Sequence, residues 1–216
     1  MNRIYLEKVF STDRMNKYFS ANPANDAKCM IHYQCNIQLS EAFYPILSIL
    51  EVALRNSINR ELVAKFGVAD WYNHFSTTAG LGKLIKEITI AQNQITKRKE
   101  LITPSKIVAE LTLGFWVRLF NAEFERILWK DLRRAFPYLL KVHRQRKNVS
   151  APLNNFRNLR NRIFHNEPIG WNLGHLQKLH DEILTIMGWV NKDLPSWAGP
   201  VDRFNTVLAD VQTRLM

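Results

Sequence analysis

Residues 40–67 read SEAFYPILSILEVALRNSINRELVAKFG, and this stretch predicts a long helix in the core of the protein. Leucine and isoleucine recur in it at three- and four-residue steps, which places them on one helix face: Leu47, Leu50, Leu54, Ile58 and Leu62. Pro45 lies early enough to cause only a kink, and Gly67 is a residue type that often ends a helix. We expect this helix to extend from about Asp26 to Phe66.

The rest of the chain also has helical patterns, and no segment reads as a confident β-strand. Glycine and proline are scarce, with eight residues of each, so the frequent turns of an all-β protein are missing. Further helices are expected over about 81–100, from Thr103-Pro104 past Phe120, up to Phe136, from Ser150 to Pro168, and over 173–190 and 203–215. We predict an all-α protein with residues 1–25 as a helical lead-in and residues 26–216 as one helical domain.

Basic residues exceed acidic residues in this chain. Thirty Lys and Arg stand against nineteen Asp and Glu, which gives a net charge of +11. Such an excess attracts polyanions, and here the positive residues are clustered. We expect nucleic acid as a partner, and a basic protein kept soluble by its charge is the plainer alternative. The candidate nucleic-acid contacts are Arg144, Arg146, Lys147, Arg157 and Arg162.

The sequence has no pattern of export or of membrane insertion. Its apolar runs are shorter than the roughly 18 residues that cross a bilayer, and residues 1–7, MNRIYLE, lack the apolar core of a secretion signal. Cys29 and Cys35 are six residues apart in an expected helix and fall on different faces, which argues against a disulfide. These patterns predict a cytoplasmic protein without membrane contact.

Several familiar catalytic motifs are missing from the sequence. The six histidines form no i,i+4 pair and no His-Glu-x-x-His motif, so no set of metal ligands stands out. The chain has no Gly-x-x-x-x-Gly-Lys loop, no Gly-x-Gly-x-x-Gly loop and no Gly-x-Ser-x-Gly turn. We therefore expect neither a metal nor a cofactor.

Residues 153–169, LNNFRNLRNRIFHNEPI, place a charged residue within an apolar helix face. At about 100° per residue, Arg160 projects into the middle of the sector that the apolar side chains fill. A guanidinium in that position must be paired or must face a solvated cleft, because burying it unpaired is costly. Glu51 or another acid could pair it. Arg160 is therefore either part of a structural ion pair or a site residue.

The position of His165 favours the second of these roles for Arg160, that of a site residue. His165 shares a helix face with Asn161, and Pro168 follows within a turn, so the imidazole is expected at a helix end that a substrate can reach. A permanent cation beside a group that titrates near neutrality suits phosphodiester chemistry. RNA supplies its own nucleophile, the 2′-hydroxyl, so that this chemistry needs no metal. The alternative role for His165 is a cap on the last carbonyls of the helix.

Three stretches of the chain resemble one known family. Residues 160–165, RNRIFH, match the Arg-Asn-x-x-x-His form of the R-x4–6-H motif of the HEPN superfamily. Residues 165–169, HNEPI, resemble the His-x-Glu-Pro-Ile ending of its Abi-like (abortive infection) branch. Residues 51–59, EVALRNSIN, and 110–116, ELTLGFW, also resemble that branch. The resemblance covers roughly residues 30–190.

The resemblance implies a HEPN-like helical bundle, with additional helices at the N- and C-termini, that dimerises and joins two motifs into one metal-independent ribonuclease site. Arg160 would stabilise the scissile phosphate, and His165 would transfer a proton or contact the phosphate. Asn161 would orient one of them, and Glu51 and Arg55 would give structural support. The branch is associated with bacterial defence against phage. RNA, a second copy of the chain, and an inhibitory antitoxin or non-coding RNA are the expected partners.

Two other functions stay open at this point. The same positive clusters fit a non-catalytic RNA-binding or scaffold protein that holds a structured non-coding RNA. The C-terminal tryptophans, Trp189 and Trp197, fit a helical protein-interaction module if they are exposed, although packing of the last helices onto the core is the plainer role.

Overall fold

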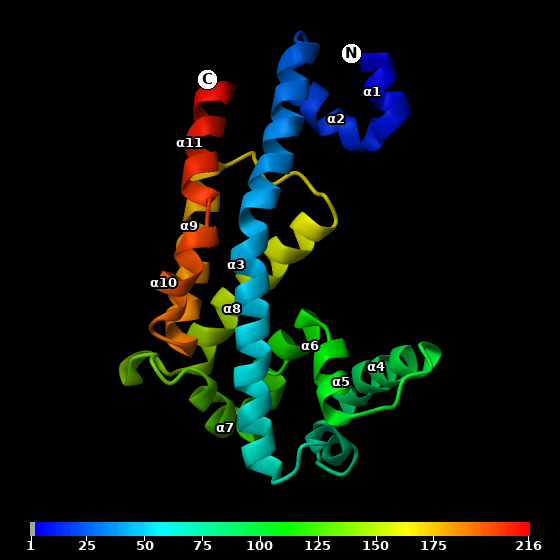
Figure 1. Ribbon diagram of the computed structural model, residues 1–216, viewed down its shortest axis with the longest axis vertical. Helices are drawn as coiled ribbons and strands as arrows, with labels where there is room; N and C mark the ends of the chain where they lie inside the picture. The colour runs from blue at the N-terminus through cyan, green and yellow to red at the C-terminus, as the bar shows by residue number, and fades with distance from the viewer. Residues whose placement is uncertain (1–2) are drawn as a thin grey trace.

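A computed structural model describes residues 3–216, and this range is helical without a β-strand (Figure 1). The α-helices are α1 (Arg3–Phe10), α2 (Thr12–Ala21), α3 (Asp26–Phe66), α4 (Ile85–Lys97), α5 (Pro104–Glu110), α6 (Leu113–Arg118), α7 (Lys130–Leu132), α8 (Arg146–Phe164), α9 (Leu173–Val190), α10 (Leu194–Ala198) and α11 (Phe204–Leu215). Short 3-10 turns cover Trp71–Ser76, Gly82–Leu84, Ala122–Phe124, Arg133–Ala135, Lys141–His143 and Gly199–Val201, and a π-helical turn covers Glu125–Trp129. The prediction of an all-α protein is confirmed.

Helix α3 is the axis of the molecule, and every other part of the chain is arranged around it (Figure 1). The Asn25 side chain caps its start by accepting a hydrogen bond from the backbone N–H of Lys28 at 2.9 Å. Gly67 ends it in a left-handed conformation, with φ of 76°, which glycine adopts without strain. The helix keeps Pro45 inside it, and its two ends agree with the prediction from the sequence.

Helices α8, α9 and α11 cover one part of α3 (Figure 1). The rings of Phe43 on α3 and Phe204 on α11 lie 4.4 Å apart between centroids. His180 on α9 is buried beside them, and its Nε2 lies 2.8 Å from Oδ2 of Asp202, just before α11. These contacts fix the C-terminal helices and leave the end of α8 to be positioned by other groups.

The segment from Pro104 to Arg118 departs from the prediction. A single helix through Phe120 was expected, but the chain breaks at Leu111, whose ψ of 128° is extended, and forms α5 and α6. The Thr112 hydroxyl caps α6 by accepting from the N–H of Phe115 at 3.3 Å, and the indole of Trp116 donates to the Leu111 carbonyl. The break satisfies its own backbone groups, which explains why apolar periodicity did not reveal it.

Three other helix boundaries also differ from the prediction. The helix expected over 81–100 is shorter, because Gly82–Leu84 forms a 3-10 turn and α4 ends at Lys97. Helix α8 begins at Arg146, four residues before the predicted start at Ser150, and contains Pro152 in its second turn. The basic stretch over 141–149, whose sequence fits either a loop or a frayed helix end, contains a 3-10 turn and the first residues of α8.

The N-terminal lead-in forms two short helices, α1 and α2, beside the start of α3 (Figure 1). Met15, Tyr18 and Phe19 of α2 are buried in a small second core that includes Cys29 of α3. Cys29 and Cys35 are both buried and unpaired, which agrees with the expectation of no disulfide. Residues 1 and 2 of the predicted lead-in lie outside the described range.

Helix α3 is apolar enough, over a window of 18 residues with a mean hydropathy of 1.4, to pass a length-and-composition test for a membrane span. Buried core helices of soluble proteins share this length and composition. In this structure, Leu39, Ile46, Leu50 and Leu54 of α3 are fully buried against other helices of the same chain.

Candidate functional site

Arg160 pairs across the core face of α8 with Glu51 of α3. Its Nε lies 3.2 Å from Oε2 of Glu51, and the two side chains are 28% and 25% exposed. The guanidinium carbon lies 4.1 Å from the centre of the Phe164 ring, a cation–π contact one turn further along α8. A carboxylate on one edge and a ring on one face hold the guanidinium in a fixed orientation at the surface.

The two terminal nitrogens of the Arg160 guanidinium remain available as hydrogen-bond donors. Within residues 3–216, Nη1 and Nη2 of Arg160 make no hydrogen bond. Because a guanidinium has five N–H donors in a planar fork, four of them stay free after Nε bonds to Glu51. The ion pair with Glu51 therefore compensates the charge while leaving the donors that match a phosphate.

His165 lies at the end of α8, where its backbone N–H bonds to the carbonyl of Asn161 at 2.9 Å. Helix α8 ends at Phe164, earlier than the predicted stop at Pro168, because Asn166 turns the chain with φ of 54°. The imidazole is exposed and makes no hydrogen bond with the described residues, so the structure uses only the backbone of His165 as a cap.

Asn161 is exposed next to these two residues, and its side chain makes no hydrogen bond with Arg160 or His165. The contact that orients Arg160 comes from Glu51 instead. The orienting role expected for Asn161 stays a prediction.

The loop that follows His165 is fixed by a buried amide on α3. The Asn36 side-chain oxygen accepts from the N–H groups of Ile169 and Gly170, at 2.6 and 3.2 Å, and its amide nitrogen donates to the Glu167 carbonyl at 3.4 Å. Asn36 is a functional candidate that the sequence reasoning missed. A polar residue between the buried Cys35 and Leu39 of an apolar helix is the signal that could have found it.

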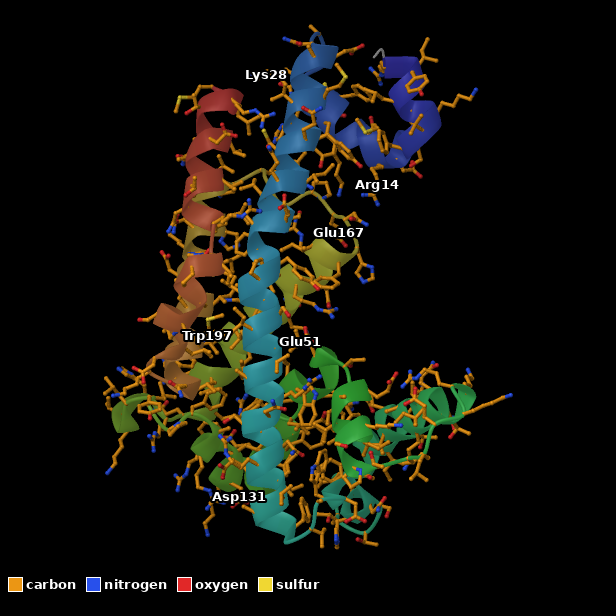
Figure 2. All side chains as sticks on the ribbon, in the orientation of Figure 1. Arg14, Lys28, Glu51, Asp131, Glu167 and Trp197 are labelled. Carbon is orange, nitrogen blue, oxygen red and sulfur yellow. The ribbon has the colours of Figure 1, made fainter. Side chains whose placement is uncertain are left out.

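Two arginines hold the same loop from outside. Arg14 of α2 donates from Nη1 to the Asn166 carbonyl at 2.5 Å, and Figure 2 shows Arg14 facing the segment that carries Glu167. Arg162 bonds to the Pro168 carbonyl and lies 3.5 Å from Glu167. Arg162, expected as a nucleic-acid contact, thus also closes the loop. The N-terminal helices reach the candidate site through Arg14.

A groove of about 630 Å³ lies between α3 and the end of α8, and Phe164, on which Arg160 stacks, is one of the residues that line it. Its walls include the half-exposed rings of Tyr44 and Phe164, which stack with centroids 5.9 Å apart, and its far end carries the ion pair between Arg203 and Glu41. Exposed aromatic faces of this kind are the surfaces on which nucleobases stack. Phe164 links the groove to Arg160, because its ring lines the groove and also contacts the Arg160 guanidinium.

Of the basic residues before Arg160, two are engaged inside the fold. Arg144 donates to the carbonyls of Leu139 and Pro137, at 2.8 and 2.6 Å. Arg146 donates to the Phe120 carbonyl at 3.0 Å and pairs with Glu125 at 2.8 Å. Their guanidinium groups hold the segment before α8, so charge clustering in the sequence did not identify free cations here.

Lys147 and Arg157, both on α8, remain as cations without an ion pair within the described residues. Lys147 is exposed and makes no hydrogen bond or ion pair within the described range. Arg157 is half-buried and makes only a 3.4 Å hydrogen bond to the side chain of Asn158.

Arg55 lies one turn after Glu51 on α3, but it does not contact Arg160. Its Nη1 donates to the Ala109 carbonyl at 3.5 Å, and its Nε is buried without a partner. The two residues that were expected to give structural support therefore differ: Glu51 holds Arg160, and Arg55 faces α5.

The two C-terminal tryptophans also differ. Trp189 packs edge-on against Phe136, whereas Trp197 is 70% exposed. No group of three or more His, Cys, Asp or Glu that suits a metal occurs within residues 3–216. Comparison of the chain with models of known protein families, with curated proteins and with solved structures found no match.

Proposed function

We propose that this protein is a metal-independent endoribonuclease, similar to the Abi-like branch of the HEPN superfamily, that acts in bacterial defence against phage. The observation that supports this proposal most strongly is the state of Arg160: Glu51 holds its Nε, and its terminal nitrogens are free at the surface. The motif RNRIFH places an unpartnered, exposed imidazole five residues later.

The reaction needs only the substrate and these side chains. The 2′-oxygen of RNA attacks the adjacent phosphorus, and the bond from phosphorus to the 5′-oxygen of the next nucleotide breaks. The 2′-hydroxyl loses a proton and the leaving 5′-oxygen gains one, so that the products are a 2′,3′-cyclic phosphate and a 5′-hydroxyl. His165 moves one of these protons, and Arg160 offsets the charge that builds on the phosphate oxygens.

A second copy of the chain completes the site in this proposal. Arg160 and His165 of one subunit would face the same residues of its partner across a shared cleft that holds one RNA strand. The groove beside Phe164 would hold a base next to the scissile phosphate, and Lys147 and Arg157 would contact phosphates further along the strand. An antitoxin or non-coding RNA would keep the enzyme inactive in the cytoplasm, without a role for a membrane.

The first test is cleavage of mixed RNA by the purified protein in EDTA. We expect cleavage by the unaltered protein and its loss in Arg160→Ala and His165→Ala. Arg126→Ala and His175→Ala are matched controls, because both residues are exposed and lie outside the motif. A strict requirement for added metal, or full activity in both motif variants, would remove the proposed mechanism.

The shared site has its own test. Mixing the Arg160→Ala and His165→Ala proteins should not restore a full pair of motifs, so the mixture should stay well below the activity of the unaltered protein. Light scattering should show a dimer. A strictly monomeric protein that cleaves RNA would contradict the shared site and leave the chemistry of Arg160 and His165 in place.

A further inference from the structure

Arg55 differs from the other arginines within residues 3–216 because one of its side-chain nitrogens, Nε, is buried without a hydrogen-bond partner. Arg118, Arg146 and Arg160 each pair with a carboxylate, namely Glu87, Glu125 and Glu51. Arg55 forms no ion pair within the described range, its Nε is buried without a hydrogen bond, and its single contact to Ala109 is 3.5 Å long. A partly desolvated guanidinium without a counter-charge is unfavourable unless an anion binds there.

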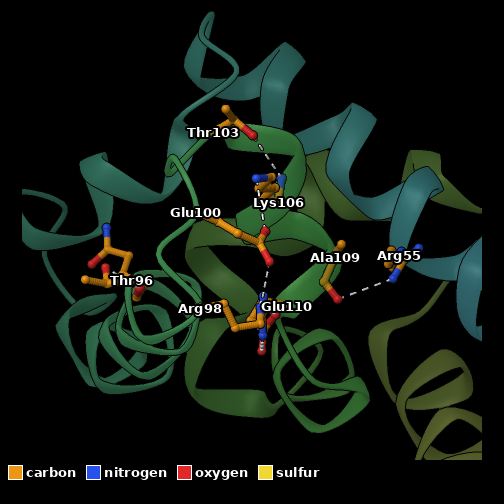
Figure 3. Close-up of polar contacts among 9 residues, drawn as sticks. Arg55, Thr96, Arg98, Glu100, Thr103, Lys106, Ala109 and Glu110 are labelled. Atoms are coloured by element: carbon orange, nitrogen blue, oxygen red, sulfur yellow. Dashed lines mark hydrogen bonds and ion pairs between the residues drawn. The ribbon is translucent and has the colours of Figure 1, made fainter.

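The surroundings of Arg55 form a polar pocket of about 470 Å³ between α3 and α5. Asn56 and Asn59 line it from α3, Ser105 and Ala109 line it from α5, and no Asp or Glu is among the residues that line it. Figure 3 shows Glu100 and Glu110 near α5, where they are bound to Arg98 and Lys106 rather than to Arg55.

The side chains around Arg55 offer donors. The Oδ1 of Asn59 accepts a hydrogen bond from the Trp71 indole at 2.8 Å. Because an indole nitrogen can only donate, this bond fixes the orientation of the amide and leaves the Asn59 NH₂ group as a free donor. Asn56 is exposed at the edge of the pocket, and its side chain makes no hydrogen bond within residues 3–216. One guanidinium and two amides without an acid match the oxygens of an anion.

We propose that this pocket binds a phosphate group through Arg55, Asn56 and Asn59. A volume of about 470 Å³ exceeds what one phosphate needs and leaves room for the nucleoside that carries it. Glu51 and Arg55 are four residues apart on α3, so the pocket lies about 6 Å along the helix from the residue that holds Arg160. If the phosphate belongs to an RNA strand, a step that rests on the proposed function, the pocket binds that strand beside the scissile bond.

The test is calorimetric titration of the whole protein with three probes: inorganic phosphate, adenosine 5′-monophosphate and a short single-stranded RNA. The variants are Arg55→Gln and Asn56→Asp, the second of which places a carboxylate at the edge of the pocket on an exposed position. Lys106→Gln is the matched control. Like Arg55→Gln, it removes one positive charge, but Lys106 is on α5 and does not line the pocket. Circular dichroism checks the fold of each variant, and Asn56→Asp decides the result if Arg55→Gln does not fold.

We expect saturable binding of at least one probe, weakened about tenfold or more in both pocket variants and less than twofold in the control. Loss restricted to phosphate and the mononucleotide assigns the pocket to a free ligand, whereas weaker RNA binding with a salt slope lowered by about 1 assigns it to the RNA backbone. No saturable binding of any probe, or equal losses in the pocket variants and in Lys106→Gln, would overturn the proposal. Titration of Arg160→Ala separates the two proposals, because the pocket should still bind phosphate when cleavage is lost.

Discussion

Arginines occur at both the start and the end of α8, but those at the start are bound within the fold, whereas Arg160 near the end keeps free N–H donors. At the start, Arg146 is held by Glu125 and by the Phe120 carbonyl, and Arg144 just before it is held by two further carbonyls. At the end, Arg160 bonds to Glu51 through Nε, stacks on the ring of Phe164 and keeps the N–H groups of its terminal nitrogens free. The comparison shows that the number of unused donors, rather than the number of positive charges, marks a surface that can bind phosphate.

The largest effect should come from Arg160→Lys, which keeps the charge but removes the planar fork. A lysine cannot bind Glu51 through one nitrogen and a phosphate through two others, so RNA cleavage in EDTA should fall about 100-fold or more. Initial rates on a fluorescent RNA measure the effect. A rate within threefold of that of the unaltered protein would show that only the charge matters.

Asn36→Ala should weaken both the fold and the site. The substitution leaves the buried N–H groups of Ile169 and Gly170 without an acceptor, so the free energy of unfolding should fall by about 1–3 kcal/mol. Cleavage should slow as well, because the loop after His165 is no longer fixed. Urea denaturation is the measurement, with the exposed Gln34→Ala on the same helix as the control. Equal stability of the two variants would contradict the role assigned to Asn36.

Arg146→Ala tests the other side of the comparison. Loss of the bonds to Glu125 and to the Phe120 carbonyl should lower the free energy of unfolding by about 1–2 kcal/mol. The cleavage rate per folded molecule should stay unchanged. Denaturation and rate measurements on the same preparation check both statements. A large loss of RNA affinity at unchanged stability would instead make Arg146 a direct contact.

Lys147→Ala should do the opposite of Arg146→Ala: it should affect RNA binding and not stability, and the effect should be smaller. This exposed side chain has no partner in the described range, so stability should stay the same. RNA affinity should fall a few-fold, and the dependence of affinity on salt should weaken by about one counterion. Binding titrations at several salt concentrations are the measurement, and an unchanged salt slope would remove Lys147 from the proposed RNA path.

The smallest expected effect is a dependence of stability on pH that arises from His32. Its ring packs against Trp171, with ring centroids 4.2 Å apart. Burial lowers the pKa of His32 below the usual histidine value; a hydrogen bond with the Gly170 backbone opposes this shift, and nearby Lys28 adds to it. The unfolded chain therefore takes up a proton first as the pH falls below about 6.5, so the free energy of unfolding declines there and levels off below the pKa of the folded state. Thermal melts should show a steeper loss of stability in this range than in His32→Gln. Parallel curves for the two proteins would contradict this account.

Local patterns predicted the central helix and its ends correctly. The capped start near Asp26, the left-handed Gly67 and the Leu stripe are all set by neighbouring residues, which a sequence displays directly. The break at Leu111 was missed because the apolar pattern alone was followed there; Thr112, which caps α6 three residues before Phe115, is the local signal that could have marked it. Apolar periodicity continues across such a break.

The candidate site also contains some features that the sequence predicted and others that it did not. The position of Arg160 on the apolar face, and the need for an acid to pair it, followed from helix geometry, and Glu51 is the acid that the structure supplies. The roles of Asn36, Arg14, Arg144 and Arg146 depend on contacts with backbone groups far along the chain or in the adjoining loop, which no local pattern encodes. The assignment of Arg160, His165 and Asn161 to catalysis stays a prediction.

The most direct measurement is the chemistry of the RNA ends that the purified protein produces in EDTA. Mass spectrometry of a cleaved oligonucleotide should find a 2′,3′-cyclic phosphate on one fragment and a 5′-hydroxyl on the other, and a single 2′-deoxy substitution at the cleavage point should block the reaction. Fragments with 3′-hydroxyl and 5′-phosphate ends, or cleavage of the deoxy-substituted strand, would contradict attack by the 2′-oxygen and with it the roles given to Arg160 and His165.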